Sequence, residues 1–119
     1  MLPAQNRMRR SGDFRATIKH GVRGKASSLM LHLQSPGDAE QADQDSTLVG
    51  FVVPKTVGNA VVRNRLTRQL RHLMRERIED LNAGGSVVIR VFPSARGRTY
   101  DELRADLDKA WDRAARARG

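Results

Sequence analysis

Three short segments of the chain combine apolar and β-branched residues in the way that β-strands do. Residues 28–34 alternate between two faces, whereas residues 48–53 and 86–92 are almost continuously apolar. Side chains two positions apart share one face of a strand, so the three leucines of the first segment lie together. We also allow for a further short strand near residues 22–28.

A spacing of three to four positions between apolar residues predicts helices. The first predicted helix spans residues 11–20, with Ser11 as its N-terminal cap and Gly21 at its end. The second and longest spans residues 59–81, with Asn59 as its cap. Both segments begin after polar or turn-forming residues, as helices in soluble domains do.

A capping box predicts where the third helix begins. Thr99 and Glu102 stand at the spacing at which each side chain bonds the other residue's backbone N–H. The apolar stripe that follows consists of Leu103, Leu107, Ala110, Trp111 and Ala114. The predicted order is α-β-β-(β)-α-β-α, an α+β protein in which a β-α-β unit makes the sheet mixed. We predict a small two-layer α/β sandwich.

The length of 119 residues fits one domain with one core. We predict a single domain over residues 1–119, with a flexible acidic loop at 36–47 and a loose C-terminus at 113–119. The chain has no cysteine, and its longest apolar segments are too short to cross a membrane. These features are typical of a cytoplasmic protein.

The basic and acidic residues are unevenly distributed along the chain. The net charge is +9, from 22 basic and 13 acidic residues. Residues 1–33 hold seven basic residues and one acid, and residues 48–75 hold six basic residues and no acid. Two strongly basic segments in one small domain indicate a polyanionic partner, with nucleic acid favoured over an anionic membrane surface.

The helix predicted at residues 59–81 separates its basic residues from its core face. On a helical wheel the apolar residues from Val62 to Leu81 fall on one side. The opposite side carries Asn64, Arg65, Arg68, Arg71, His72 and Arg75. Like charges three or four positions apart cost a helix roughly a few tenths of a kcal/mol each. The ridge therefore indicates a polyanion that neutralises it, and the helix N-terminus beside Lys55 adds an anion-binding feature.

The segment KTVGNAVVRNRLTRQLR, residues 55–71, resembles the characteristic motif of the bacterial ribonuclease P protein component. The triplet Arg63-Asn64-Arg65 follows Gly58-Asn59 at the spacing of that family. The flanking segments RMRRSGDFRATIKHG, LVGFVVPK and VVIRVFPSA resemble the family's first helix and the strands on either side of the motif. The resemblance covers residues 7–112 in order.

This resemblance implies a protein subunit of a ribonucleoprotein endoribonuclease. In that family the RNA subunit carries the active site and its Mg²⁺ ions and removes the 5′ leader of precursor tRNA. The protein binds the catalytic RNA and holds the leader. The implied fold contains a left-handed β-α-β crossover, although general statistics favour the right-handed form. The implied partners are the catalytic RNA subunit and precursor tRNA, with no DNA and no membrane.

The resemblance also assigns roles to individual residues. The residues expected to contact the catalytic RNA are Lys55, Asn59, Arg63, Asn64, Arg65, Arg68 and Arg71. The residues expected to line the leader cleft are Phe14, Ile18, His32, Val52 and Arg90. No catalytic or metal-binding residue is assigned to the protein. The family more often has aromatic residues at the positions of Ile18 and His32, and isoleucine cannot stack on a base. Core packing for Phe14 and a strand-surface position for His32 and Arg90 remain open.

Two other functions remain open from the residues alone. A metal-independent nuclease would need two of His20, His32 and His72 to act as acid and base, but their spacing pairs none of them. A general RNA-binding protein of the ribosomal type would use the same basic ridge. The motif at residues 55–71 favours the ribonuclease P subunit over both.

Overall fold

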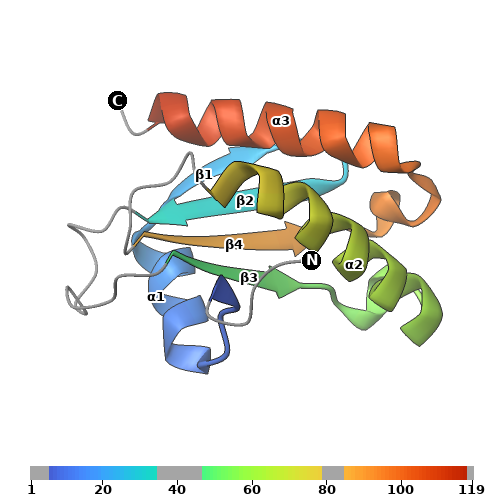
Figure 1. Ribbon diagram of the computed structural model, residues 1–119, viewed down its shortest axis with the longest axis horizontal. Coiled ribbons are helices and arrows are strands. Elements are labelled where there is room, and N and C mark those ends of the chain that lie inside the picture. The colour runs from blue at the N-terminus through green and yellow to red at the C-terminus, as the bar shows by residue number, and fades with distance from the viewer. Residues whose placement is uncertain (1–5, 35–46, 79–84, 118–119) are drawn as a thin grey trace.

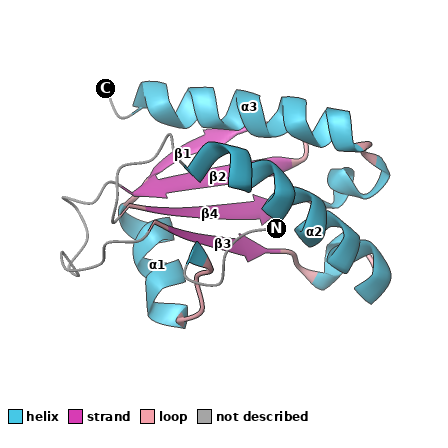
Figure 2. Ribbon diagram, viewed as in Figure 1, coloured by secondary structure: helices cyan, strands magenta, loops and turns pink. Residues whose placement is uncertain are grey.

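The computed structural model describes residues 6–34, 47–78 and 85–117. Within these ranges the chain forms three α-helices and one four-stranded sheet (Figure 2). The helices are α1 (Ser11–His20), α2 (Ala60–Arg77) and α3 (Tyr100–Ala117). The strands are β1 (Val22–Lys25), β2 (Leu29–Gln34), β3 (Leu48–Val52) and β4 (Ser86–Val91). The predicted element order is confirmed, including the fourth strand.

The sheet is mixed, as the β-α-β unit predicted. Its strand order is β1-β2-β4-β3. β2 is antiparallel to both of its neighbours, with Leu31 opposite Ile89, whereas β3 and β4 are parallel, with Gly50 opposite Val88. Parallel neighbours need a long connection, and α2 supplies it.

The main hydrophobic core lies between one face of the sheet and the helices α2 and α3 (Figure 1). The core residues of α2 are Leu66, Leu70, Leu73 and Met74, and those of α3 are Leu103, Leu107, Ala110 and Ala114. They pack against the three leucines of β2 and the odd-numbered residues of β4. The helical wheel therefore predicted the core face of α2 correctly. Leu81, which the wheel also places on that face, lies outside the described residues. Trp111 is half-buried against this core, in contact with the guanidinium of Arg77.

The connection from β3 through α2 to β4 is left-handed. In Figure 1 α2 lies in front of the sheet, β3 and β4 both point to the right, and β4 lies above β3. A right-handed crossover viewed in this way would place β4 below β3. The structure therefore has the rare handedness that the family resemblance implied, rather than the general preference.

α1 packs against the opposite face of the sheet and covers only one end of it. Its buried Thr17 hydroxyl lies 2.7 Å from the hydroxyl of Ser86 and donates to the backbone carbonyl of Asp13. The side chain of Gln34 accepts a hydrogen bond from Ser86 at 3.4 Å. Gln34 and Ser86 are directly opposite each other at this end of the sheet. The two-layer description holds for the sheet with α2 and α3, and α1 adds a partial third layer.

The helix termini confirm two of the three predicted caps. The side chain of Asn59 accepts a hydrogen bond from the Val62 N–H at 3.0 Å. Thr99 and Glu102 form the reciprocal capping box, with bonds of 3.0 and 3.2 Å. The prediction for Ser11 is wrong, because the helix already includes Ser11 and the capping position is held by Arg10 without a side-chain bond.

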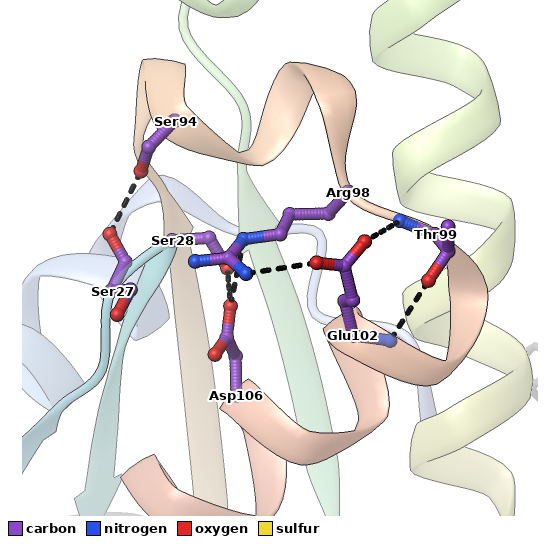
Figure 3. A network of polar contacts seen from close by, with 7 residues as sticks. All are labelled: Ser27, Ser28, Ser94, Arg98, Thr99, Glu102 and Asp106. Carbon is purple, nitrogen blue, oxygen red and sulfur yellow. Dashed lines mark hydrogen bonds and ion pairs between the residues drawn. The ribbon is translucent and has the colours of Figure 1, made fainter.

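Polar contacts around the start of α3 fix this helix to the turn between β1 and β2 (Figure 3). The carboxylate of Asp106 accepts a short hydrogen bond from the Ser28 hydroxyl and lies 3.4 Å from the guanidinium of Arg98. Arg98 also pairs with Glu102 of the capping box at 3.2 Å. Ser94 donates to the backbone carbonyl of Ser27. Asp106 is buried, and these two partners compensate its charge.

The C-terminal segment is more ordered than predicted. α3 continues to Ala117, so residues 113–117 of the predicted loose C-terminus are helical. Ala114 is fully buried, and Arg113 donates a hydrogen bond of 2.6 Å to the backbone carbonyl of Lys25. The acidic loop predicted at 36–47 lies outside the described residues, except for the buried Thr47. Among the described residues, no helix has the length and apolar character to span a membrane.

Candidate nucleic-acid interface

The basic ridge predicted on the long helix is present on the exposed side of α2. Arg65, Arg68 and Arg75 are exposed, and Arg71 is half-buried at the border of the ridge. Arg63 lies in the first turn, where its Nε donates to the Gly58 carbonyl at 3.2 Å. The surface thus displays several arginines on one side, with Asn64 between them.

The arginines of the ridge have no acidic partners among the described residues. The ion pairs in this part of the chain use four carboxylates, all on α3, and three other arginines: Arg77, Arg98 and Arg116. Arg65 donates instead to the backbone carbonyl of Arg96 at 2.8 Å. The positive charge of the ridge is therefore available to an external anion.

A pocket of about 280 Å³ lies where α2 meets the edge strand β3 and the N-terminal segment. Its polar lining consists of Arg7, Arg63, Asn64, Thr67 and Arg71. Its remaining lining residues are Met8, Phe14, Val49, Gly50, Phe51 and Val53. We call this site the arginine pocket. It combines three cations with two aromatic rings, which is the chemistry of a site for a phosphate and an adjoining base.

Arg71 is partly buried in the arginine pocket. Its Nε is buried and has no hydrogen-bond partner. Burial, and secondly the positive charge of nearby Arg7, lower the pKa of Arg71 below its usual value. An arginine remains charged in a protein despite such a shift. A phosphate in the pocket would supply the missing acceptor and offset the repulsion between the two cations.

Arg7 is a site residue that our sequence reasoning did not single out. The structure pairs Arg7 with Val49 in a parallel bridge, and the Met8 N–H donates to the Val49 carbonyl at 2.8 Å. Asn6 donates to the Thr47 carbonyl at 2.8 Å. These contacts hold the basic N-terminal segment along the outer edge of β3. In the sequence, Arg7 is visible only as part of the arginine cluster at residues 7–10. That cluster does not indicate which residues of the fold any of these arginines will contact.

A second hollow lies beside the arginine pocket, on the solvent side of α2. It is lined by Asn64, Thr67, Arg68, Arg71 and His72. Asn64, Thr67 and Arg71 line both sites, so the two form one continuous basic surface. Lys55 and Asn59 are exposed just before α2 begins. The structure therefore brings the predicted RNA-contacting residues together at one end and one side of α2.

The residues predicted to line a cleft come from four elements, α1, β2, β3 and β4, on the sheet face that carries α1. Phe14 is half-buried and lies so close to Gly50 that a Cβ at position 50 would overlap its ring. Ile18 is 37% exposed, Arg90 is exposed, and Val52, directly opposite Arg90, is half-buried. Of these residues only Phe14 reaches the arginine pocket.

His32 lies on the same sheet face but offers almost no surface to a ligand. It is 4% exposed, and its Nδ1 is buried without a hydrogen-bond partner. Burial, and then the positive charges of Arg23 and Arg90, lower the pKa of His32 below 6.5. The imidazole is therefore neutral at pH 7. None of the three histidines lines the arginine pocket, so no histidine pair is formed there.

Protonation of His32 should destabilise the fold in acid. Since its folded-state pKa lies below the unfolded value, His32 contributes stability that is present above about pH 6.5 and lost as the pH falls through the folded pKa. We expect urea unfolding to show a smaller loss of stability between pH 7.5 and 5.5 in H32Q than in the wild type. H20Q, at an exposed position, should behave like the wild type. Equal pH dependence in H32Q and the wild type would contradict this assignment.

A mixed sheet with a left-handed crossover, carrying an uncompensated arginine surface, defines a small polyanion-binding protein of the α+β class. The model of the family described as Ribonuclease P matches residues 2–115. The chain therefore belongs to the ribonuclease P protein family. Its role is that of a ribonuclease P protein subunit in tRNA processing, as the resemblance at residues 55–71 implied.

Relatives of known name match all or nearly all of the chain. The ribonuclease P protein component of Salinispora tropica is 43% identical, over 100% of this chain and 97% of the relative. The protein of the same name from Thermobifida fusca is 46% identical, over 100% of this chain and 82% of the relative. That from Streptomyces avermitilis is 44% identical, over 95% of this chain and 94% of the relative.

Solved structures share the fold at much lower sequence identity. An RNase P protein from Staphylococcus aureus superposes with a TM-score of 0.77 at 20% identity, covering 90% of this chain and 93% of that one. The RNase P protein from Thermotoga maritima gives a TM-score of 0.67 at 21% identity, covering 85% and 90%. The same architecture is therefore built from sequences that differ at about four positions in five.

Proposed function

We propose that this chain binds the catalytic RNA subunit of ribonuclease P through α2 and binds the 5′ leader of precursor tRNA on the sheet face beside α1. In this way it assists RNA-catalysed, Mg²⁺-dependent removal of the leader in the cytoplasm. The observation that carries the proposal is the arginine pocket. There Arg63 and Arg71 of α2 and the aromatic ring of Phe14 line one hollow.

The basic surface of α2 suits a structured RNA. Lys55, Arg65 and Arg68 are exposed on one side of the molecule without acidic partners among the described residues. Arginines on a helix grip phosphates without reading bases, and they do so with an affinity that falls as salt rises. A subunit that binds one folded RNA needs its phosphate-binding arginines to be held in a fixed orientation. The rigid helix, anchored in the core by its apolar side, supplies it.

The sheet face beside α1 suits a single strand of variable sequence. Phe14 offers a ring on which any base can stack, and Arg90 offers a cation for a backbone phosphate. Ile18 and Val52 add apolar surface. His32 is buried beneath this surface and offers almost no surface of its own to a leader nucleotide. Such a face tolerates many leader sequences, as an enzyme that processes all tRNA precursors requires.

We assign the Mg²⁺ ions to the RNA subunit. Among the described residues no three histidine, aspartate or glutamate side chains gather into a possible metal site. The arginine pocket is positively charged and would repel a divalent cation. The contribution of the protein is therefore to hold the two RNAs, which lowers the Mg²⁺ concentration that they need.

The test is cleavage of precursor tRNA by a bacterial ribonuclease P RNA at low Mg²⁺, with and without this protein. We expect the protein to stimulate correct 5′ cleavage and to have no activity alone. Salt-sensitive RNA binding without stimulation of a matched RNA subunit would instead support a general RNA-binding protein. Cleavage by the protein alone, abolished by replacing all three histidines, would support a protein nuclease.

A further inference from the structure

The short 3₁₀ turn η5 (Pro93–Gly97), between β4 and α3, carries a cation that lies outside the predicted RNA-contacting residues. Its Arg96 is exposed and makes no ion pair with the described residues. Arg98, two residues later, is half-buried and pairs with Glu102 and Asp106. The charge of Arg98 is therefore compensated, whereas that of Arg96 is available to an external anion.

A hydrogen bond places η5 directly beside the basic ridge of α2. The Nη2 of Arg65 donates to the backbone carbonyl of Arg96 at 2.8 Å, so this guanidinium reaches from α2 to the turn. η5 also packs against η3 (Lys55–Val57), the 3₁₀ turn that precedes α2, and neither turn contains an acid. Three cations from separate segments of the chain, Lys55, Arg65 and Arg96, thus surround one junction.

The backbone that carries Arg96 is fixed to the body of the domain. Ala95 is fully buried in the main core. On one side of it, Ser94 donates to the Ser27 carbonyl at 2.7 Å, and on the other, Arg98 bonds carboxylates of α3 (Figure 3). A cation on a fixed turn requires less ordering when it binds a ligand than one on a mobile loop.

The same turn holds the guanidinium of Arg65. A guanidinium has five N–H donors, and the bond to the Arg96 carbonyl leaves others for a phosphate. Arg65 does not line the arginine pocket, and neither does any residue of η5. The arginine surface of α2 is therefore bordered by the arginine pocket on one flank and by η5 on another.

We propose that η5 is a second wall of the interface with the catalytic RNA. In this wall the side chain of Arg96 binds a backbone phosphate of the RNA segment that Arg65 contacts, and the Arg96 carbonyl positions Arg65. The proposal rests on the proposed function, because it extends the RNA-binding surface of α2 by one element. Phosphate contacts of this kind fix the orientation of the RNA without reading its bases.

The first test is binding of the catalytic RNA over a range of salt concentrations. We expect R96A to weaken binding about tenfold at low salt and to lower the slope of log affinity against log salt by about one. R96K keeps the charge and should keep the wild-type slope, whereas R96E should bind more weakly than R96A.

A matched control removes an arginine from elsewhere on the surface. Arg116 is exposed on α3 and its charge is compensated by Asp112 at 3.1 Å, so R116A should bind like the wild type. The Arg96 side chain has no hydrogen bond or ion pair with the described residues, so R96A should have an unchanged melting temperature.

The second test locates the RNA segment that lies against η5. The chain has no cysteine, so R96C, R65C and R116C can each carry a single iron–EDTA group that cleaves nearby RNA. At saturating protein, we expect positions 96 and 65 to give overlapping cleavage sites in the catalytic RNA and position 116 to give none there. Cleavage from position 96 that is confined to precursor tRNA would overturn the proposal.

The outcomes separate this wall from the function on which it rests. If the wild type does not bind the catalytic RNA, the proposed function itself fails. If the wild type binds it and R68A/R71A binds more weakly, but folded R96A has the wild-type affinity and salt slope, only the role of η5 is wrong. Cleavage of the catalytic RNA from position 65 but not from position 96 would also overturn that role.

Discussion

Replacing Arg68 and Arg71 together by alanine should weaken binding to the catalytic RNA by about a hundredfold at low salt. Neither side chain makes a hydrogen bond or ion pair with the described residues, so their removal breaks no internal contact. A charge-assisted bond to phosphate contributes on the order of 1.5 kcal/mol, and two of them account for this loss. The slope of log affinity against log salt should fall by about two, one for each lost phosphate contact.

Filter binding over a range of salt concentrations measures both quantities. The double variant K109A/R116A removes the same charge from α3 and is the matched control, because Lys109 and Arg116 are exposed away from the ridge. Its affinity should change little. An R68A/R71A protein that binds with unchanged salt slope would show that these arginines do not neutralise phosphates. Alanine favours helix and removes the repulsion between Arg7 and Arg71, so the variant should fold normally.

Replacing Gly24 by alanine should lower the free energy of unfolding by about 3 kcal/mol or more. Gly24 lies on β1 beneath α3, and a Cβ there would overlap the Ala110 carbonyl oxygen and lie 2.6 Å from the Ala114 amide nitrogen. Both atoms belong to the helix backbone, which cannot turn away as a flexible side chain does. α3 would have to move off the sheet and give up part of its buried apolar face.

Urea unfolding followed by circular dichroism measures this loss. Gly12→Ala is the control, because nothing lies within 4 Å of a Cβ at that position in α1. Alanine should stabilise that exposed helix by roughly 0.5–1 kcal/mol. A G24A protein as stable as the wild type would mean that α3 does not approach β1 as closely as the structure has it.

The features that the sequence predicted correctly are mostly local. The caps at Asn59 and Thr99 depend on residues three positions apart, which meet in any helix that begins there. The core and basic sides of α2 follow from helical periodicity alone. The error at Ser11 is local too: serine is a common cap, but the helix begins at Ser11 itself and the capping position falls on Arg10. The helical end of α3 was underestimated because its stabilising contacts are with β1.

The candidate site divides in the same way. The resemblance at residues 55–71 identified the basic residues of α2, and the structure shows them on one surface. It did not predict that Arg7 would lie beside Arg71, because these residues are far apart in the chain and meet only through the pairing of the N-terminal segment with β3. The burial of His32 was missed for a similar reason. Strand periodicity says which face a side chain is on, but not how closely neighbouring elements pack over it.

The sequence by itself determined the elements, their order, the sign of the charge and the family. These depend on periodicity, capping and a motif, each contained in a short stretch of chain. Only the tertiary structure decided which distant residues meet: Arg7 with the arginines of α2, Phe14 with Gly50, and Lys25 with Phe92. The strand register and the left-handed crossover determine these contacts, because they fix which faces and edges of the sheet remain uncovered.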